Sequence, residues 1–310
     1  MNAMERLNQL VMEKGPLLAG LDPDIDKILK MYEGEMENYI SEDDYEEYSD
    51  YLEEIMYDYC HEYIQAVKDK VAAIKINIAF FEANGMEDLF WQVAEEATIA
   101  NLFVIADVKR ADIGNTSKQY AEAFLYEGSP IDAITINPYF GTDGVKPFLD
   151  MAKEKGKGVF VLVKTSNPSS SEIQNLELKD GRKVYQEVAE LVKKWGEYAK
   201  VDEYEKYSLV GAVVGATHPE EAALLREQMP NTFFLVPGYG AQGATAKDIA
   251  VSFDSNCGGA IVNSSRGLMF AYEKEPWKSE ITVNKWATAT KKAAALAQIE
   301  LSNAILASKV

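Results

Sequence analysis

The chain has 310 residues and a mass of 34.5 kDa, close to the upper limit for one hydrophobic core, and its 47% hydrophobic and 26% charged residues are ordinary for a globular protein. Its 31 basic and 50 acidic residues give a formal net charge of −19. That charge argues against general nucleic-acid binding and against docking to an anionic membrane surface. An anionic substrate would therefore need a local basic pocket.

The rare residue types limit the possible sites and compartments. Cys60 and Cys257 lie far apart and form no metal-binding or redox motif, so we expect a reducing, cytoplasmic location. The first fifteen residues include charged side chains and lack the apolar stretch of a signal peptide. The longest apolar runs, such as Leu209–Ala216, are too short to span a membrane. The two histidines, His61 and His218, argue against a multi-histidine zinc site.

Short apolar runs rich in β-branched residues recur along the whole chain. Most of them lack alternation, which is typical of parallel strands buried on both faces. We predict eight such strands: Pro16–Asp22, Ala73–Asn77, Leu102–Lys109, Ala133–Tyr139, Gly158–Ser166, Leu209–Thr217, Thr232–Gly240 and Gly258–Arg266.

Segments with helical spacing separate these strands. The first covers Tyr48 to Val67, with Ser41 as its N-cap and Asp44 at the capping-box position. Eight strand–helix units in this length predict a single-domain (β/α)8 barrel over residues 1–310, with a doubly wound sheet as the alternative. Further helices are predicted at Met86–Ala100, Ser117–Glu127, Val184–Trp195, Pro219–Gln228, Thr245–Ser252 and within the Ala-rich tail Val283–Val310.

Two connections are unusually long. Residues 24–70 are acidic and rich in tyrosine, and we expect a solvated helical insertion over the base of the barrel. Residues 167–207 begin with a polar run and continue into a predicted hairpin around Asp180 and Gly181. A polar loop after a barrel strand is a candidate lid.

Ionisable and amide side chains gather where the predicted strands end. Active sites of (β/α)8 barrels form at these carboxyl ends. Asp107 and Lys109 lie two apart on the third strand and so point to the same side, and Lys75 on the neighbouring strand extends the charge array. The alternative is a buried ion pair that only supports the barrel, although such pairs stabilise proteins weakly.

The last two predicted strands are followed by groups that can bind an anion. The seventh is followed by Pro-Gly-Tyr-Gly-Ala-Gln-Gly at 237–243, which offers exposed backbone N–H groups. The eighth is followed by Ser-Ser-Arg-Gly at 264–267, which adds the guanidinium of Arg266. Barrels recurrently bind phosphate at these two loops, and arginine suits a pair of phosphate oxygens. We therefore predict a phosphate site here.

The segment Asp-Val-Lys-Arg-Ala-Asp-Ile-Gly-Asn-Thr at 107–116 resembles the Asp-x-Lys-x-x-Asp-Ile-x-x-Thr pattern of the orotidine 5′-phosphate decarboxylase family. The resemblance extends over nearly the whole chain, and every fixed position is met. Its longer bacterial-type branch is indicated by Ala-Phe-Phe-Glu at 79–82 and by Asn-Pro-Tyr-Phe-Gly at 137–141. The other matching segments are Gly-Leu-Asp-Pro at 20–23, Lys75, Thr-Ser-Asn-Pro at 165–168, the glycine turn at 237–243 and Arg266.

The resemblance implies decarboxylation of orotidine 5′-phosphate to uridine 5′-phosphate in pyrimidine biosynthesis, without metal or other cofactor. By resemblance, Asp22 and Lys75 hold the ribose, Lys75 also belongs to the catalytic charge array beneath C6 of the pyrimidine, and Lys109 protonates that atom. It also implies a homodimer with shared active sites. The resemblance also implies catalytic roles for Asp107 and Asp112, with Asp112, Ile113 and Thr116 supplied by the other subunit. It places Ser166 at the edge of the base, and Pro237, Gln242 and Arg266 around the phosphate.

Two other functions stay open at this point. Related phosphosugar decarboxylases and aldolases reuse the Asp-x-Lys region but require a magnesium ion. The continuation through Asp112 and the Ser166-Asn167-Pro168 segment favour the pyrimidine enzyme over these relatives. A catalytically silent phosphate-binding barrel is the third possibility, and the intact set of lysines and aspartates argues against it.

Overall fold

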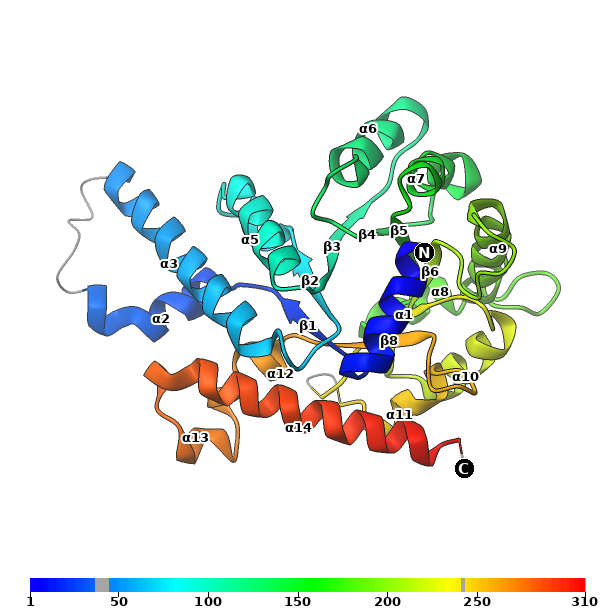
Figure 1. Ribbon diagram of the computed structural model, residues 1–310. Helices are drawn as coiled ribbons and strands as arrows, with labels where there is room; N and C mark the ends of the chain where they lie inside the picture. The colour runs from blue at the N-terminus through cyan, green and yellow to red at the C-terminus, as the bar shows by residue number, and fades with distance from the viewer. Residues whose placement is uncertain (37–44, 241–242, 310) are drawn as a thin grey trace.

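The computed structural model describes residues 1–36, 45–240 and 243–309, and its eight parallel strands close into a barrel in sequence order (Figure 1). This confirms the predicted fold, and each observed strand lies within or within one residue of its predicted range. The strands are β1 (Leu17–Leu21), β2 (Ala73–Asn77), β3 (Phe103–Arg110), β4 (Ala133–Ile136), β5 (Gly158–Lys164), β6 (Val210–Val214), β7 (Phe234–Pro237) and β8 (Ala260–Ser264).

Helices follow the strands and surround the barrel, as Figure 1 shows. Closure comes from the pairing of β1 with β8, in which Leu17 lies opposite Val262. The helices that connect successive strands or follow the last are α3 (Tyr45–Val67), α5 (Glu87–Ile99), α6 (Gly114–Leu125), α7 (Gly141–Lys155), α9 (Val184–Ala199), α10 (Pro219–Gln228), α11 (Ala246–Ile249) and α14 (Trp286–Ala307). Additional helices are α1 (Ala3–Lys14), α2 (Ile25–Met36), α4 (Ala79–Glu82), α8 (Ser171–Gln174), α12 (Arg266–Met269) and α13 (Trp277–Glu280), with 3-10 turns at Pro168–Ser170, Ala250–Ser252, Ala271–Glu273 and Val283–Lys285.

The base of the barrel is covered by α1, which the sequence analysis did not predict. The Asn2 side chain caps α1 by accepting from the N–H of Glu5 at 2.9 Å. From α1, Asn8 accepts a hydrogen bond from the N–H of Gly259, just before β8, and Met4 packs against Gly158 at the start of β5. The helix therefore crosses the amino ends of several strands.

The described part of the acidic segment, residues 24–36 and 45–70, lies beside the barrel and not over its base, so that part of the prediction is wrong. Helix α3 packs along the side of the barrel against α5 and α14, because one face carries buried apolar and aromatic residues. Tyr59 stacks on Trp286 of α14 with ring centroids 4.5 Å apart, and the Tyr63 hydroxyl donates to the carbonyl of Gly20 at 3.0 Å. The predicted capping residues Ser41 and Asp44 lie outside the described residues.

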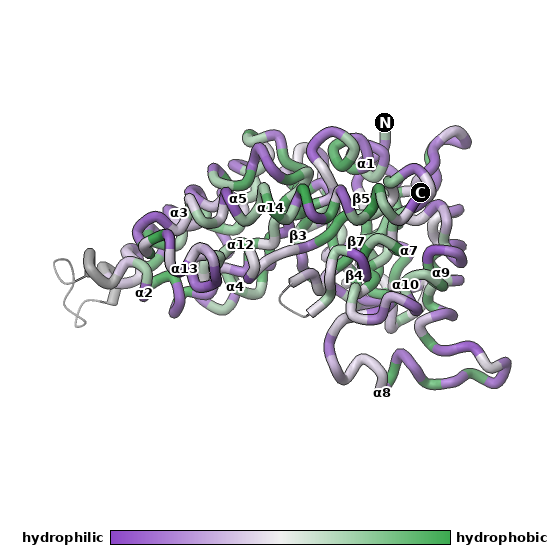
Figure 2. Tube along the Cα trace, turned by 90° about the horizontal axis from the view of Figure 1, so that it is seen from below, coloured by the Kyte–Doolittle hydropathy of each residue, from purple (hydrophilic) through white to green (hydrophobic). Residues whose placement is uncertain are grey.

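Helix α7 is a second element that the sequence analysis missed. Its buried residues Val145, Phe148, Leu149 and Ala152 have clear helical spacing, but Pro147 lies within the helix and obscures the pattern. Beyond β5, α8 and the polar segment that follows it extend away from the barrel (Figure 2). The predicted hairpin is present there, since Glu177 and Lys183 form an antiparallel bridge.

Candidate active site

A cavity of about 410 Å³ opens at the carboxyl ends of the strands. Its polar lining comes mainly from the ends of β1 to β5 and of β8, and its apolar lining comes from β5, β6 and β7. The lining residues are Asp22, Lys75, Asn77, Asp107, Lys109, Thr135, Leu162, Thr165, Ser166, Asn167, Val213, Leu235, Pro237, Asn263 and Ser265.

A lysine–aspartate–lysine chain forms the charged wall of this cavity. Lys75 Nζ donates to Asp107 Oδ2 at 2.5 Å, and Lys109 Nζ donates to Asp107 Oδ1 at 2.7 Å. Asp22 Oδ1 lies 4.0 Å from Lys75 Nζ. The Lys75 and Asp107 side chains are each only 8% exposed, whereas that of Lys109 is 50% exposed. One buried pair therefore supports an ammonium group that is open to the cavity.

The backbone near Lys109 departs from regular strand geometry. The β3–β4 register shifts between Ala106 and Arg110, and Lys109 adopts a φ of +44°, in the left-handed region. The Thr135 hydroxyl accepts from the N–H groups of Val108 and Lys109 at 3.1 and 3.0 Å, and it donates to Asp107 Oδ1 at 2.8 Å. Thr135 thus holds both the strained backbone and the central carboxylate. Such local strain is often found at functional sites.

The buried pair is charged on both sides. Burial alone would raise the pKa of Asp107, but the positive charges of Lys75 and Lys109 and their hydrogen bonds hold it well below its ordinary value. Burial alone would lower the pKa of Lys75, but the charges of Asp107 and Asp22 raise it above its ordinary value. Lys75 and Asp107 therefore carry fixed opposite charges at neutral pH.

Most predicted residues of the cavity wall come together. Asp22, Lys75, Asp107 and Lys109 meet on one side, while Ser166 and Pro237 line it from the ends of β5 and β7. Close approach of β1 and β8 requires Gly20, because a Cβ atom there would lie 1.9 Å from Ser265 Oγ.

Other predicted residues lie outside the cavity lining. Asp112, Ile113 and Thr116 are in the loop after β3 and the first turn of α6, where the Ile113 side chain is 54% exposed. Arg266 is exposed at the start of α12, beside the lining residue Ser265. Gln242 lies outside the described residues. Around it, Gly240 N–H donates to the Ala244 carbonyl at 3.1 Å and thereby closes the turn.

Two further polar residues line the cavity without a role that followed from the sequence. Thr135 was not predicted, although it is the hydroxyl residue within the otherwise apolar fourth strand. Asn263 is one of the amide residues that end the predicted strands, and its Nδ2 donates to Ser265 Oγ at 3.2 Å.

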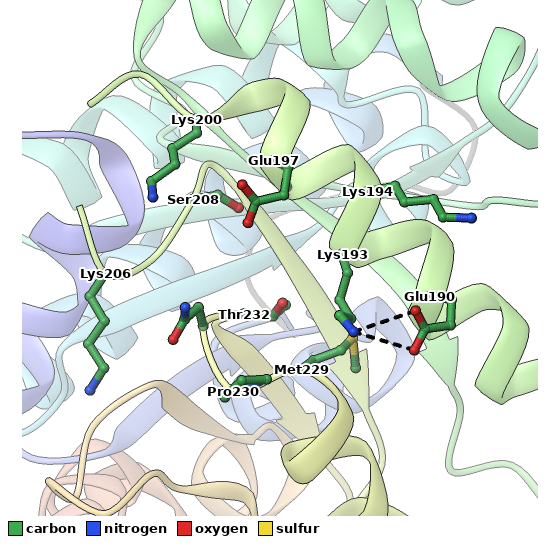
Figure 3. A pocket seen from close by; sticks show the side chains of 12 residues that line it. Glu190, Lys193, Lys194, Glu197, Lys200, Lys206, Ser208, Met229, Pro230 and Thr232 are labelled. Carbon is green, nitrogen blue, oxygen red and sulfur yellow. Dashed lines mark hydrogen bonds and ion pairs between the residues drawn. The ribbon is translucent and has the colours of Figure 1, made fainter. Parts of the chain in front are cut away.

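A second cavity of about 350 Å³ lies at the opposite end of the barrel, beside α9 and the segments that lead into β6 and β7 (Figure 3). Lys193, Lys200, Lys206 and Glu197 are among its lining residues. The pair of Lys193 and Glu190 spans 3.5 Å, and the Lys193 side chain is 44% exposed. Because these charges face water and no buried lysine–aspartate chain lines this cavity, we place the candidate active site at the carboxyl ends.

The described residues lack two features that would indicate other functions. Within residues 1–36, 45–240 and 243–309, no group of three or more His, Cys, Asp and Glu side chains is arranged to hold a metal ion. Among the helices in these residues, none is both long and apolar enough to cross a membrane.

Known proteins are similar to this chain in sequence and in fold over most of its length. A family model described as orotidine 5′-phosphate decarboxylase / HUMPS family matches residues 44–277. The orotidine 5′-phosphate decarboxylase of Clostridium tetani is 39% identical over 274 residues, 88% of this chain and 90% of that protein. The one of Rhodopirellula baltica is 37% identical over 297 residues, 93% and 95% of the two chains.

A solved structure extends the same relation to three dimensions. The OMP decarboxylase of Leishmania donovani has a TM-score of 0.73 and 28% sequence identity, and the match covers 99% of this chain and 100% of that one. These matches confirm the barrel fold and the resemblance to an enzyme family of decarboxylases. The chain belongs to the orotidine 5′-phosphate decarboxylase / HUMPS family.

Proposed function

We propose that this protein decarboxylates orotidine 5′-phosphate to uridine 5′-phosphate, the last step of pyrimidine nucleotide synthesis, without a metal ion or organic cofactor. The observation that carries the proposal is the chain Lys75–Asp107–Lys109, whose outer ammonium faces the cavity while the inner pair is buried. The named relatives support the same substrate.

The reaction needs a charge-stabilising group and a proton donor at one position. The bond between C6 and the carboxylate breaks, carbon dioxide leaves, and the electron pair stays on C6. The ammonium of Lys109 stabilises that pair and then transfers its proton to C6. The resulting amine regains a proton from solvent. Asp107, 2.7 Å from Lys109 Nζ, holds the donor in place.

The rest of the substrate is bound by the groups around this centre. Asp22 and Lys75 bind the ribose hydroxyls, and Ser166 contacts the edge of the base from the opposite wall. Arg266 and Gln242 bind the phosphate with the backbone N–H groups of the turn that begins at Pro237. Binding energy from the remote phosphate then supports catalysis at C6.

We further propose a homodimer in which Asp112, Ile113 and Thr116 complete the partner's site. In one chain they lie outside the cavity, and Ile113 is exposed together with Tyr139 (81%) and Phe140 (49%). Asp112 and Phe140 both border Gly144, where a Cβ atom would lie 2.8 Å from the Asp112 carbonyl and 2.6 Å from Phe140 Cβ. Exposed apolar side chains beside a charged loop favour a protein interface.

The proposal also includes a cytoplasmic location and a single domain. Both cysteines are free thiols, which is usual in a reducing compartment. One continuous cluster of buried residues extends from Ala3 to Ile305, which supports one domain.

The activity is tested by adding orotidine 5′-phosphate to purified, EDTA-treated protein and following the ultraviolet absorbance of the pyrimidine. We expect turnover that survives chelation. Activity that disappears with EDTA and returns with Mg²⁺ would instead support a phosphosugar-type enzyme. No turnover under either condition would support the silent barrel.

The shared site is tested by mixing two inactive variants, Lys109→Ala and Asp112→Ala. In a mixed dimer, one site carries both changes and the other carries neither, so activity returns after subunit exchange. With random exchange it should approach about one quarter of wild type per subunit. If mixed dimers form without recovery, Asp112 acts within its own chain.

A further inference from the structure

Two side chains of the polar segment after β5, those of Gln174 and Asn175, form hydrogen bonds back to the end of that strand. Gln174, the last residue of α8, accepts from the Thr165 N–H at 3.0 Å and donates through Nε2 to Thr165 Oγ1 at 2.7 Å. Its neighbour Asn175 accepts from Lys164 Nζ at 2.6 Å. The two amides therefore contact two successive residues of the strand end.

Lys164 is the buried anchor of these contacts. Its side chain is 1% exposed, and its ammonium lies 3.2 Å from Glu221 Oε2 on α10 and 5.3 Å from the ring centroid of Tyr185 on α9. The Asn175 amide bridges the pair, since its Nδ2 donates to Glu221 Oε1 at 3.5 Å. A buried ammonium needs such partners. The strand end is thereby linked to α8, α9 and α10.

The anchored residues adjoin the cavity. Thr165, Ser166 and Asn167 all line it, and Thr165 Oγ1 donates to Asn167 Oδ1 at 2.6 Å. On the other side, the Gly215 N–H donates to the Lys164 carbonyl at 2.8 Å, and a Cβ atom at Gly215 would lie 3.0 Å from the Ser166 nitrogen. Ser166 is therefore held between β6 and the returning segment.

We propose that Gln174 and Asn175 are positioning residues that fix Thr165 to Asn167 and thereby set Ser166 against the pyrimidine base. This inference rests on the proposed function. Because Ser166 contacts the base and not the phosphate, the two amides should influence recognition of the base alone. Gln174 fixes the peptide next to Ser166, and Asn175 fixes the strand end through the buried lysine.

The test compares ligands that contain and lack the base. In Gln174→Leu, the dissociation constant for uridine 5′-phosphate should rise about tenfold, the scale for losing hydrogen bonds to a half-buried segment. That for ribose 5-phosphate should stay unchanged. Asn175→Ala should give the same selectivity by the second route, so the test does not depend on one variant folding.

The matched control is Glu172→Gln on the same short helix. The Glu172 side chain is exposed, and it makes no hydrogen bond or ion pair within the described part of the chain, so both dissociation constants should match wild type. Equal weakening of both ligands in Gln174→Leu and Asn175→Ala would show a general loosening of the fold and overturn the inference.

A double-mutant cycle shows whether Gln174 acts through Ser166. Once Ser166→Ala has removed the hydroxyl, Gln174→Leu should cause less than a twofold further loss of uridine 5′-phosphate affinity. Full additivity would overturn the inference. If wild type turns over orotidine 5′-phosphate but the variants show no base-selective loss of affinity, the proposed function stands and this inference is wrong. If wild type shows no turnover, the proposed function itself is wrong.

Discussion

The two ends of the barrel both hold a cavity lined by lysines and acidic residues, but they differ in how far water reaches the charges. At the carboxyl end, the Lys75 and Asp107 side chains are each 8% exposed and their atoms lie 2.5 Å apart. At the amino end, Lys193 is 44% exposed and lies 3.5 Å from Glu190. Exposed pairs contribute little because water screens them, while buried charges interact strongly. The Lys206–Asp254 pair at the amino end buries only its carboxylate, since the Lys206 side chain is 40% exposed. Burial of both partners of a pair, and not the number of lysines, therefore distinguishes the candidate active site.

The largest expected effect is that of Lys109→Ala. The substitution removes the proposed proton donor and leaves the phosphate-binding groups intact, so kcat should fall by several orders of magnitude. Affinity for the product uridine 5′-phosphate should be largely retained. Steady-state kinetics and calorimetric titration measure the two quantities. A nearly normal kcat would exclude Lys109 as the acid.

Arg266→Ala should have the next largest effect. Losing a charged hydrogen-bond partner of the phosphate should reduce kcat/KM by roughly 2–4 kcal/mol in transition-state binding. Orotidine, which lacks the phosphate, should be a poor substrate of wild type and of Arg266→Ala alike. The substitution should barely change kcat/KM for orotidine. Equal losses with the two substrates would place the role of Arg266 elsewhere.

Strand pattern and motif spacing predicted most of the architecture, and they placed at strand ends the charged residues Asp22, Lys75, Asp107 and Lys109, which line the cavity. Continuous apolar runs are typical of buried parallel strands, so the barrel could be predicted. The contact of Asp107 with Lys109 could be predicted because residues two apart on a strand point to the same side. The register shift and the positive φ of Lys109 could not, because they depend on pairing with Thr135 across the sheet. Helix α7 was not predicted because Pro147 lowers the local helix propensity. In the folded protein, the packing of the buried face of α7 outweighs that low propensity.

The amino end contains one well-buried carboxylate that should matter for stability instead of catalysis. Asp254 is 9% exposed, contacts Lys206 Nζ at 2.5 Å, and accepts hydrogen bonds from the Tyr207 hydroxyl and the N–H of Gly258. Burial would raise the pKa of Asp254, but these groups together lower it to about 2. Asp254 thus stabilises the fold above the ordinary pKa of the carboxyl group, and this contribution is lost as the pH falls from about 4 to 2.

Asp254→Asn tests this role. At pH 7 the variant should lose on the order of 2 kcal/mol of unfolding free energy, and its stability should change less than that of wild type between pH 4 and pH 2. Urea unfolding at several pH values measures both effects. The kcat/KM at neutral pH should be unchanged, since Asp254 does not line the carboxyl-end cavity. Loss of activity in the folded variant would contradict the separation of the two ends.

The smallest effect is expected for Lys193→Ala in the amino-end cavity. Lys193 is exposed on α9, and its pair with Glu190 is worth at most about 0.5 kcal/mol at such a site. Alanine has the higher helix propensity and offsets part of that loss, so the midpoint of urea unfolding should hardly move. The matched substitution at the other end, Lys75→Ala, leaves Asp107 buried without one of its two lysine partners and should strongly reduce kcat. Similar effects of the two substitutions on kcat would mean that burial does not separate the cavities, and the active site would have to be reconsidered.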